Sequence, residues 1–186
     1  MSDTAVTLAR WEAEEKAVRA KQRGAAAIDV RTLADIPGIE VFKRVLAGEI
    51  PLAPIQDTLD FILLEAEPGR ALFQGRPAHK FYNPIGSIHG GWYAALLDSA
   101  LGCAVHCALP AGKAYTTLEF KVNMVRALTD RVPLVRVEGK AVHVGGQVAT
   151  SEARLFDAEG RLYAHGTTTC LVFAPRSHQA HPPATA

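Results

Sequence analysis

The sequence predicts an α+β fold in which a curved antiparallel sheet wraps round one long helix. Residues 58–76 have the pattern of two strands joined by a turn, and residues 90–109 that of a helix. Residues 115–173 alternate with period two, which is typical of further strands. Because the helix is apolar on almost every side, it should be enclosed by other elements rather than lie on a surface.

The N-terminal part of the chain predicts two helices that precede this fold. Residues 5–23 form a mostly polar helical pattern, which we interpret as a solvated arm or an oligomer contact. Residues 36–51 predict a short helix with Ile39, Phe42 and Val45 on one face, ended by Gly48 and a proline. We therefore divide the chain into an N-terminal helical extension (1–50) and a main domain (51–173), followed by a disordered tail (174–186).

The strands of the main domain are bounded by turn residues. Residues 67–70, Glu-Pro-Gly-Arg, predict the turn between the first two strands. After the helix, which a proline and a glycine end at 110–112, four strands are expected to follow one another as a meander. The first of them should present one apolar face, made of Leu118, Phe120, Val122 and Met124.

Composition excludes several classes of protein. The chain has 186 residues, 48% of them hydrophobic, which suits one domain with extensions. Its net charge is +1 without a basic block, so no nucleic-acid partner is expected. The longest apolar run, 92–109, contains Asp98 and His106, so we expect a buried helix and no membrane span. An odd number of cysteines, three, without a signal peptide pattern indicates a cytoplasmic protein.

A metal or cofactor site has weak support. Cys103, His106 and Cys107 lie close together on the helix and could ligate a metal, or the cysteines are small buried hydrophobes. We favour the second interpretation because no further ligand cluster accompanies them. No phosphate-loop, dinucleotide or zinc signature occurs, so no metal and no cofactor are expected.

The start of the helix and its one acid are the candidate chemistry. At Gly90 and Gly91 the helix offers backbone N–H groups without helical partners to an oxyanion, or the glycines only permit a tight turn or close packing. Asp98 is costly to bury unless it acts as nucleophile or base, or accepts from a buried donor. Eight residues of regular helix separate Gly90 from Asp98 by roughly 12 Å. One reacting centre cannot contact both within one chain, so the spacing favours a two-fold dimer with shared sites.

The stretch "NPIGSIHGGWYAALLDSALG", residues 83–102, closely resembles the signature of hotdog-fold acyl-CoA thioesterases of the phenylacetate-pathway (PaaI-like) group. The likeness includes Asn-x-x-Gly-x-x-His-Gly-Gly, an acid nine residues beyond the histidine, and the following strand "TTLEFKVNMVRAL". It covers roughly residues 57–173. The resemblance implies a hotdog fold, hydrolysis of an acyl-CoA, sites at subunit interfaces, and dimers that pair into homotetramers.

The resemblance also implies roles for individual residues. Gly90 would donate its N–H to the oxyanion, and Asp98 would be the catalytic carboxylate. Asn83 would hold the acyl end or the nucleophile, while His89 would polarise the substrate or only cap the helix. A threonine positions the attacking water, and here Thr117 is preferred to Thr116 by counting back from "VNMVRA".

Substrate contacts are less well defined by the sequence. Relatives often carry a basic residue just after the "H-x-G" turn, where this chain has Gly146, so the phosphate anchor of coenzyme A is open. Arg126 is a weak candidate for this phosphate anchor, and the alternative interpretation, an ordinary surface arginine, is favoured. Trp92 and Tyr93 line an acyl pocket or belong to the core.

Two questions of mechanism and class stay open at this point. A free aspartate, with a pKa near 4, is a weak base at neutral pH, which favours direct attack on the thioester over activation of water. A hotdog dehydratase or hydratase is an alternative, but its Asp before Asn-Pro with a following His is absent. A non-catalytic acyl-CoA-binding or sensing module is the other.

Overall fold

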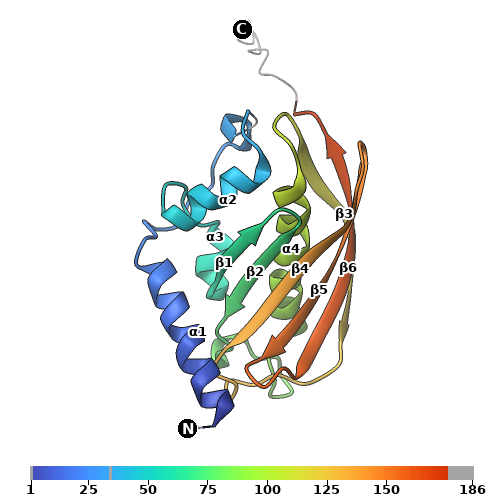
Figure 1. Cartoon of the computed structure of the whole chain (residues 1–186). Coiled ribbons are helices and arrows are strands. Elements are labelled where there is room, and N and C mark those ends of the chain that lie inside the picture. Colours follow the sequence, from blue (N-terminus) through green and yellow to red (C-terminus); the bar gives the residue numbers. More distant parts are fainter. Residues whose placement is uncertain (1, 34, 176–186) are drawn as a thin grey trace, which may run out of the picture.

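The computed structural model describes residues 2–33 and 35–175. Six antiparallel strands form one sheet that curves round a long helix, α4 (Gly90–Ala108) (Figure 1). This arrangement confirms the predicted α+β fold, and the bounds of α4 agree with the prediction to within one residue. Most of the tail expected from Ala174 onward lies outside the described residues.

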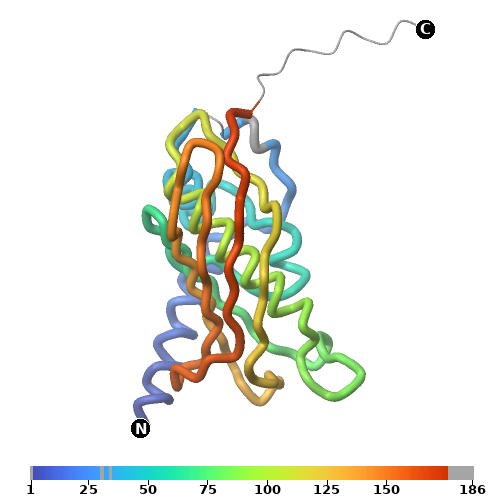
Figure 2. The backbone as a smooth tube through the Cα atoms, turned by 90° about the vertical axis from the view of Figure 1, so that its right-hand side faces the viewer, coloured from blue at the N-terminus to red at the C-terminus, as the bar shows by residue number. Residues whose placement is uncertain are grey.

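The sheet has the order β1-β2-β4-β5-β6-β3. Its strands are β1 (Phe61–Glu67), β2 (Arg70–Gly75), β3 (Ala114–Met124), β4 (Val135–Val144), β5 (Val148–Asp157) and β6 (Leu162–Phe173). The expected meander of four strands is therefore wrong at its first member, because β3 pairs with β6 and β2 pairs with β4. Period-two alternation identifies a strand but not its neighbour, and β3 becomes the free edge of the sheet beside α4 (Figure 2).

The predicted apolar face of β3 is also corrected by the structure. The register shifts between Thr117 and Glu119, so Leu118 occupies a bulge and leaves the alternation. Phe120 and Met124 pair with residues of β6 that are buried under α4, yet 40% of Phe120 and 50% of Met124 are exposed. The cause is the position of β3 at the edge, where α4 covers it only in part.

Helix α4 packs against the concave face of the sheet at very short range. A Cβ on Gly139 of β4 would overlap the Ala100 carbonyl oxygen, so glycine is needed where helix and strand cross. The central residues of α4 are fully buried, and with the inner residues of the strands they form the main core. Members on the helix include Trp92, Tyr93, Leu96, Leu97, Ala100 and Leu101.

The extension contains two helices, α1 (Asp3–Arg19) and α2 (Gly38–Ala47), and a 3₁₀ turn at Val30–Leu33, and a third helix, α3 (Pro54–Leu59), follows it before β1. The short helix predicted at 36–51 is confirmed as α2, which ends at Gly48 with a φ of 77°. Helix α3 was not predicted, and it delays the first strand from Thr58 to Phe61. No helix among residues 2–33 and 35–175 is long and apolar enough to cross a membrane.

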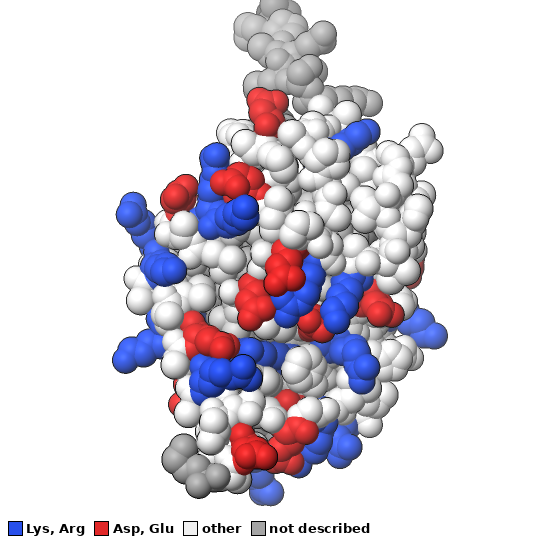
Figure 3. All heavy atoms as spheres, viewed as in Figure 1, with Lys and Arg blue, Asp and Glu red and all other residues white. Residues whose placement is uncertain are grey.

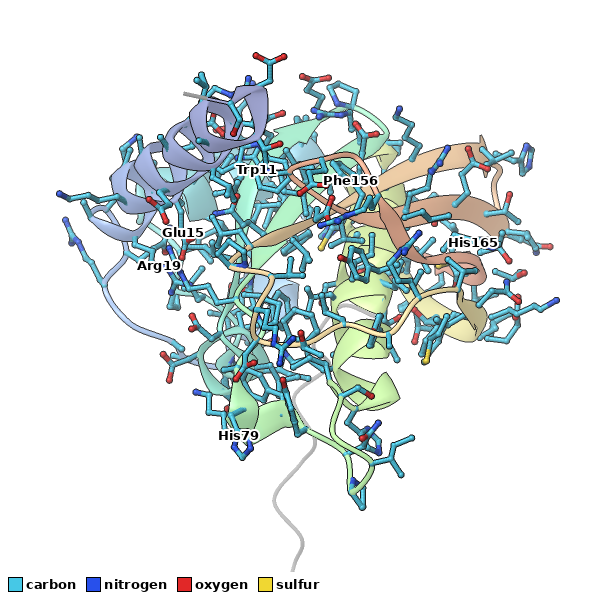
Figure 4. All side chains as sticks on the ribbon, turned by 90° about the horizontal axis from the view of Figure 1, so that it is seen from below. Trp11, Glu15, Arg19, His79, Phe156 and His165 are labelled. Atoms are coloured by element: carbon cyan, nitrogen blue, oxygen red, sulfur yellow. The ribbon has the colours of Figure 1, made fainter. Side chains whose placement is uncertain are left out.

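Helix α1 packs on the convex face of the sheet through the buried residues Trp11 and Glu15, which corrects the predicted solvated arm, while an oligomer contact stays a prediction. Trp11 is 4% exposed and meets Phe156 edge-on, with ring centroids 6.2 Å apart (Figure 4). Glu15 is 2% exposed and accepts hydrogen bonds from Arg19, Gln74 and Arg76 at 2.6–3.0 Å. Elsewhere on this face, acidic and basic side chains interleave without a large patch of one sign (Figure 3).

We expect Glu15→Gln to lower the free energy of unfolding by about 1–3 kcal/mol at pH 7, because two guanidinium groups lose the negative charge and one of the two oxygens of their buried acceptor. Burial raises the pKa of Glu15, but the hydrogen bonds from Arg76, Arg19 and Gln74 outweigh it and hold that pKa below its usual value. A carboxylate with a depressed pKa stabilises the fold above its unfolded pKa of about 4.3, and this contribution is lost as pH falls through the folded pKa.

Urea unfolding of the wild type and Glu15→Gln at pH 7 and at pH 3 measures this difference. It should shrink at the lower pH, because below a pKa of about 4.3 the unfolded wild type binds a proton that the folded carboxylate, with its lowered pKa, binds less readily. Glu12→Gln is the matched control, since Glu12 is exposed on the same helix. An equal difference at both pH values would contradict the assigned ion pairs.

Candidate active site

The first turn of α4 leaves one backbone donor free. His89 is the N-cap, and its Nδ1 accepts a hydrogen bond from the Gly91 N–H at 2.9 Å. The Trp92 N–H donates to the His89 carbonyl oxygen, also at 2.9 Å. Within the described part of the chain, the Gly90 N–H makes no hydrogen bond. Gly90 is thus the available donor at the positive end of the helix dipole, whereas the Gly91 N–H is already engaged.

A depression of about 320 Å³ lies beside Gly90. It is lined in part by Asn83, Tyr93, Met124 and Arg126. A Cβ on Gly90 would come within 2.8 Å of the Met124 Cε, so close packing by itself gives a reason for glycine here. The structure therefore places three predicted residues, Asn83, Gly90 and Arg126, round one hollow at the N-terminal end of α4.

Asn83 organises the loop before the helix. Its Oδ1 accepts hydrogen bonds from the Ile85 and Ser87 N–H groups, both at 3.1 Å, and its Nδ2 donates to the Ser87 Oγ at 3.0 Å. The neighbouring Arg126 is exposed, with its guanidinium 5.9 Å from the Tyr163 ring centroid. Asn83 thus shapes the hollow through the loop backbone, while Arg126 offers a positive charge at its edge.

Asp98 lies further along α4, facing β3. The Thr117 hydroxyl donates to its Oδ1 over 3.4 Å, a long hydrogen bond that leaves the two groups loosely joined. Burial raises the pKa of Asp98, and the Thr117 hydroxyl offsets this only in part. Thr116 is exposed and pairs with Leu171 on β6. The structure thus brings Thr117, and not Thr116, to the carboxylate.

The two groups of residues do not meet within one chain. Helix α4 is continuous from Gly90 to Ala108, so the roughly 12 Å separation of Gly90 and Asp98 applies. Asp98 is not among the residues that line the depression beside Gly90. The chain therefore carries two separate groups, the Gly90 donor at one level of α4 and Asp98 with Thr117 at another.

The cysteines on α4 are free thiols in an apolar environment. Burial raises the pKa of Cys107 to about 12 and that of Cys103 further still. In the residues the structure describes, no group of three His, Cys, Asp or Glu side chains is arranged to hold a metal ion. Trp92 and Tyr93 are each 3% exposed and belong to the core, although Tyr93 also borders the depression beside Gly90.

A cavity of about 430 Å³ beside the C-terminal half of α4 was not anticipated from the sequence. The extension forms one wall, and Ser99, Cys103 and His106 of α4 form another. Its wall residues are mostly aliphatic and are scattered from Ala26 to His106. Aliphatic residues without regular spacing carry no signature of a cavity, so no sequence signal could have identified it.

Comparison with known proteins gives concordant matches. Residues 85–164 match the model of the thioesterase superfamily. A 1,4-dihydroxy-2-naphthoyl-CoA hydrolase of Listeria monocytogenes is 23% identical over 118 residues, which are 63% of this chain and 94% of the relative.

Two solved structures share the fold. A phenylacetic acid degradation-related protein of Ralstonia eutropha JMP134 is 26% identical with a TM-score of 0.64. The match covers 70% of this chain and 98% of that one. A mutant of the phenylacetic acid degradation protein PaaI of Thermus thermophilus is also 26% identical, with a TM-score of 0.57 and coverage of 63% and 97%.

Proposed function

We propose that this chain hydrolyses an acyl-CoA and that Asp98 acts on the thioester, because residues 85–164 match the thioesterase superfamily and a similar protein is a coenzyme A thioester hydrolase. The observation that carries the proposal is the half-buried Asp98 carboxylate beside the Thr117 hydroxyl on α4. The named activity of the Listeria relative supports coenzyme A as the leaving group. No cofactor takes part, since a thioester needs only water, a base and an oxyanion donor.

The chemistry follows from the charge state of Asp98. The preference for direct attack rests on the low pKa of a free aspartate, and burial of Asp98 weakens that argument because it raises the pKa. In our proposal Asp98 takes a proton from a water held by Thr117, and the resulting hydroxide attacks the thioester carbonyl carbon. The carbonyl oxygen becomes an oxyanion that accepts from a Gly90 N–H. The C–S bond then breaks, and the coenzyme A thiolate takes the proton from Asp98.

The Gly90 donor comes from a partner subunit in this proposal. Strand β3 is a free edge whose exposed apolar residues include Leu118, Phe120 and Met124, and such an edge favours pairing with a second copy. Gly90 lies beside Met124 and Asp98 contacts Thr117, so the oxyanion donor and the acid lie beside residues 124 and 117 of β3, respectively.

These levels define the register of the pair. If two β3 strands pair antiparallel about a two-fold axis near residues 120 and 121, the partner's Met124 lies level with Thr117. The partner's Gly90 then lies level with Asp98, and one site is completed from both chains. A dimer would hold two such sites.

A second exposed apolar surface supports the homotetramer that the resemblance implies. It lies on the convex side of the sheet, away from α1, where Figure 3 shows few charges at the upper right. Its exposed members are Val142, Val148, Leu171 and Phe173. We propose that two dimers associate through this surface, which covers the part of the convex side that α1 leaves free.

Release of free thiol from a panel of acyl-CoAs tests the proposed reaction. Short, medium and aromatic acyl groups are offered to the full chain, and we expect coenzyme A and free acid from at least one class. Saturable binding without turnover across the panel would instead indicate a sensing module. A shifted or hydrated double bond in the product would indicate a dehydratase or hydratase.

A further inference from the structure

An apolar cavity of about 430 Å³, open on one side, lies between α4, the N-terminal extension and α3, and we call it the acyl chamber. The segment 26–33, α2 and α3 form its outer walls, and Ser99, Cys103 and His106 form the wall on α4. Val45 of α2 and Leu63 of β1 also face it. The residues that build most of the chamber precede residue 85, where the thioesterase superfamily match begins.

The chamber begins beside the proposed reacting group. Ser99 follows Asp98 directly on α4, and Cys103 lies little more than one turn further along the helix. The pKa of the Cys103 thiol is raised by burial, by Cys107 and by the negative charge of Asp98, as expected if the carboxylate lies close to this wall. A thioester carbonyl held at Asp98 therefore has a short route for its acyl group into the chamber.

The chemistry of the walls selects a hydrocarbon. The Ser99 hydroxyl donates to the Ala95 carbonyl oxygen at 2.9 Å, and the Gln56 Oε1 accepts from the Ala53 N–H at 3.0 Å. Most of the other wall residues are apolar, so the hydroxyl groups of a hydroxylated aromatic ring would give up hydrogen bonds to water for few partners in the chamber. An unsubstituted alkyl chain loses no hydrogen bond by entering.

We propose that the acyl chamber holds the alkyl chain of the substrate, so that the protein prefers aliphatic acyl-CoAs of medium length. At about 30 Å³ for each water-sized group, the cavity volume corresponds to about fourteen such groups. Because the chamber is open on one side, we expect it to cover a chain of roughly ten carbon atoms. The inference rests on the proposed function, and it adds that the extension sets the chain length. The coenzyme A moiety leaves on the opposite side, by the depression beside the partner's Gly90.

A series of straight-chain acyl-CoAs from two to fourteen carbons gives the first test. We expect kcat/KM to rise about three- to fourfold with each methylene that enters the chamber, until it is full near ten carbons. A flat profile, or one that falls from the shortest chain onward, would overturn the inference.

Filling the chamber gives the second test. Val45→Trp should lower the ratio of kcat/KM for decanoyl-CoA over butyryl-CoA at least tenfold. Ala27→Trp, on the exposed rim, should act in the same direction and serves if Val45→Trp does not fold. Val6→Trp is the matched control, because Val6 is 52% exposed on α1 outside the chamber, and it should keep the wild-type ratio. An unchanged ratio in a folded chamber variant would refute the assignment.

Binding separates this inference from the proposed hydrolysis. S-decyl-CoA and S-butyl-CoA are thioethers that cannot be hydrolysed, and calorimetry gives their dissociation constants. We expect S-decyl-CoA to bind at least a hundredfold more tightly, and Val45→Trp to remove most of that difference. If this holds but no acyl-CoA is hydrolysed, the chamber stands and the proposed function fails. If acyl-CoAs are hydrolysed but the two thioethers bind equally, the proposed function stands and the chamber fails.

Discussion

Asp98→Asn is expected to lower kcat by about 10²- to 10⁴-fold, the usual contribution of a general base, while the protein stays folded and still binds S-butyl-CoA. The amide keeps the size of the carboxylate and a hydrogen bond to Thr117, but it cannot take a proton from water. Thiol release measures the rate, calorimetry the binding, and circular dichroism the fold. The remaining activity should come from the oxyanion donor and from positioning alone.

The pH profile distinguishes the proposed role from a structural one. Burial raises the pKa of Asp98, and the base must be deprotonated. Wild-type kcat should therefore fall tenfold per unit as pH drops below a pKa that lies above the ordinary aspartate value of about 3.9. Asp98→Asn should lose this acid limb. Asp57→Asn, an exposed aspartate on α3, is the control and should keep both rate and profile. An Asp98→Asn protein with most of the wild-type rate would exclude the role as base.

Local signals in the sequence predicted where the helices and strands lie better than which strands pair with one another. Glycines at the start of α4 and Pro110 after its end bound the helix, and alternation identified the strands. Which strand pairs with β3 depends on the long connection of residues 125–134, which places β4 beside β2 and leaves the edge of β6 to β3. Nothing in the alternation of β3 records that choice, nor the bulge at Leu118 that interrupts its predicted apolar face.

The candidate site was predictable where its parts are close in sequence. Gly90 and Asp98 share one helix, and Thr117 required only that the register of β3 place it, rather than Thr116, under α4. The buried role of Glu15 was not predictable, because its partner Arg76 is 61 residues away and a lone acid on a polar helix resembles a solvated one. The acyl chamber was not predictable for the same reason, because its wall residues are distant in sequence and come together only when the extension folds onto α4.

Mixing two inactive variants is expected to restore roughly a quarter of wild-type activity. Asp98→Asn removes the base, and Gly90→Pro removes the free backbone donor at the first position of α4, where proline is tolerated. In a dimer with shared sites, a mixed pair collects both defects in one site and none in the other. Half of the randomly formed pairs are mixed, and each holds one intact site out of two. If each chain built its own site, every site would keep one defect and no activity would return.

The chain offers a control within the same experiment. Asp98→Asn that is dissociated and reassociated alone, under the same conditions, gives the background activity of the exchange procedure. Gly90 is not among the glycines with positive φ, so the proline ring does not force a new backbone conformation there, although Met124 must move. Circular dichroism establishes that Gly90→Pro folds, and mass spectrometry of differently labelled chains establishes that subunits exchange. With both established, a mixture no more active than its components would refute the site shared across β3, and Asp98 would have to find its oxyanion donor within its own chain.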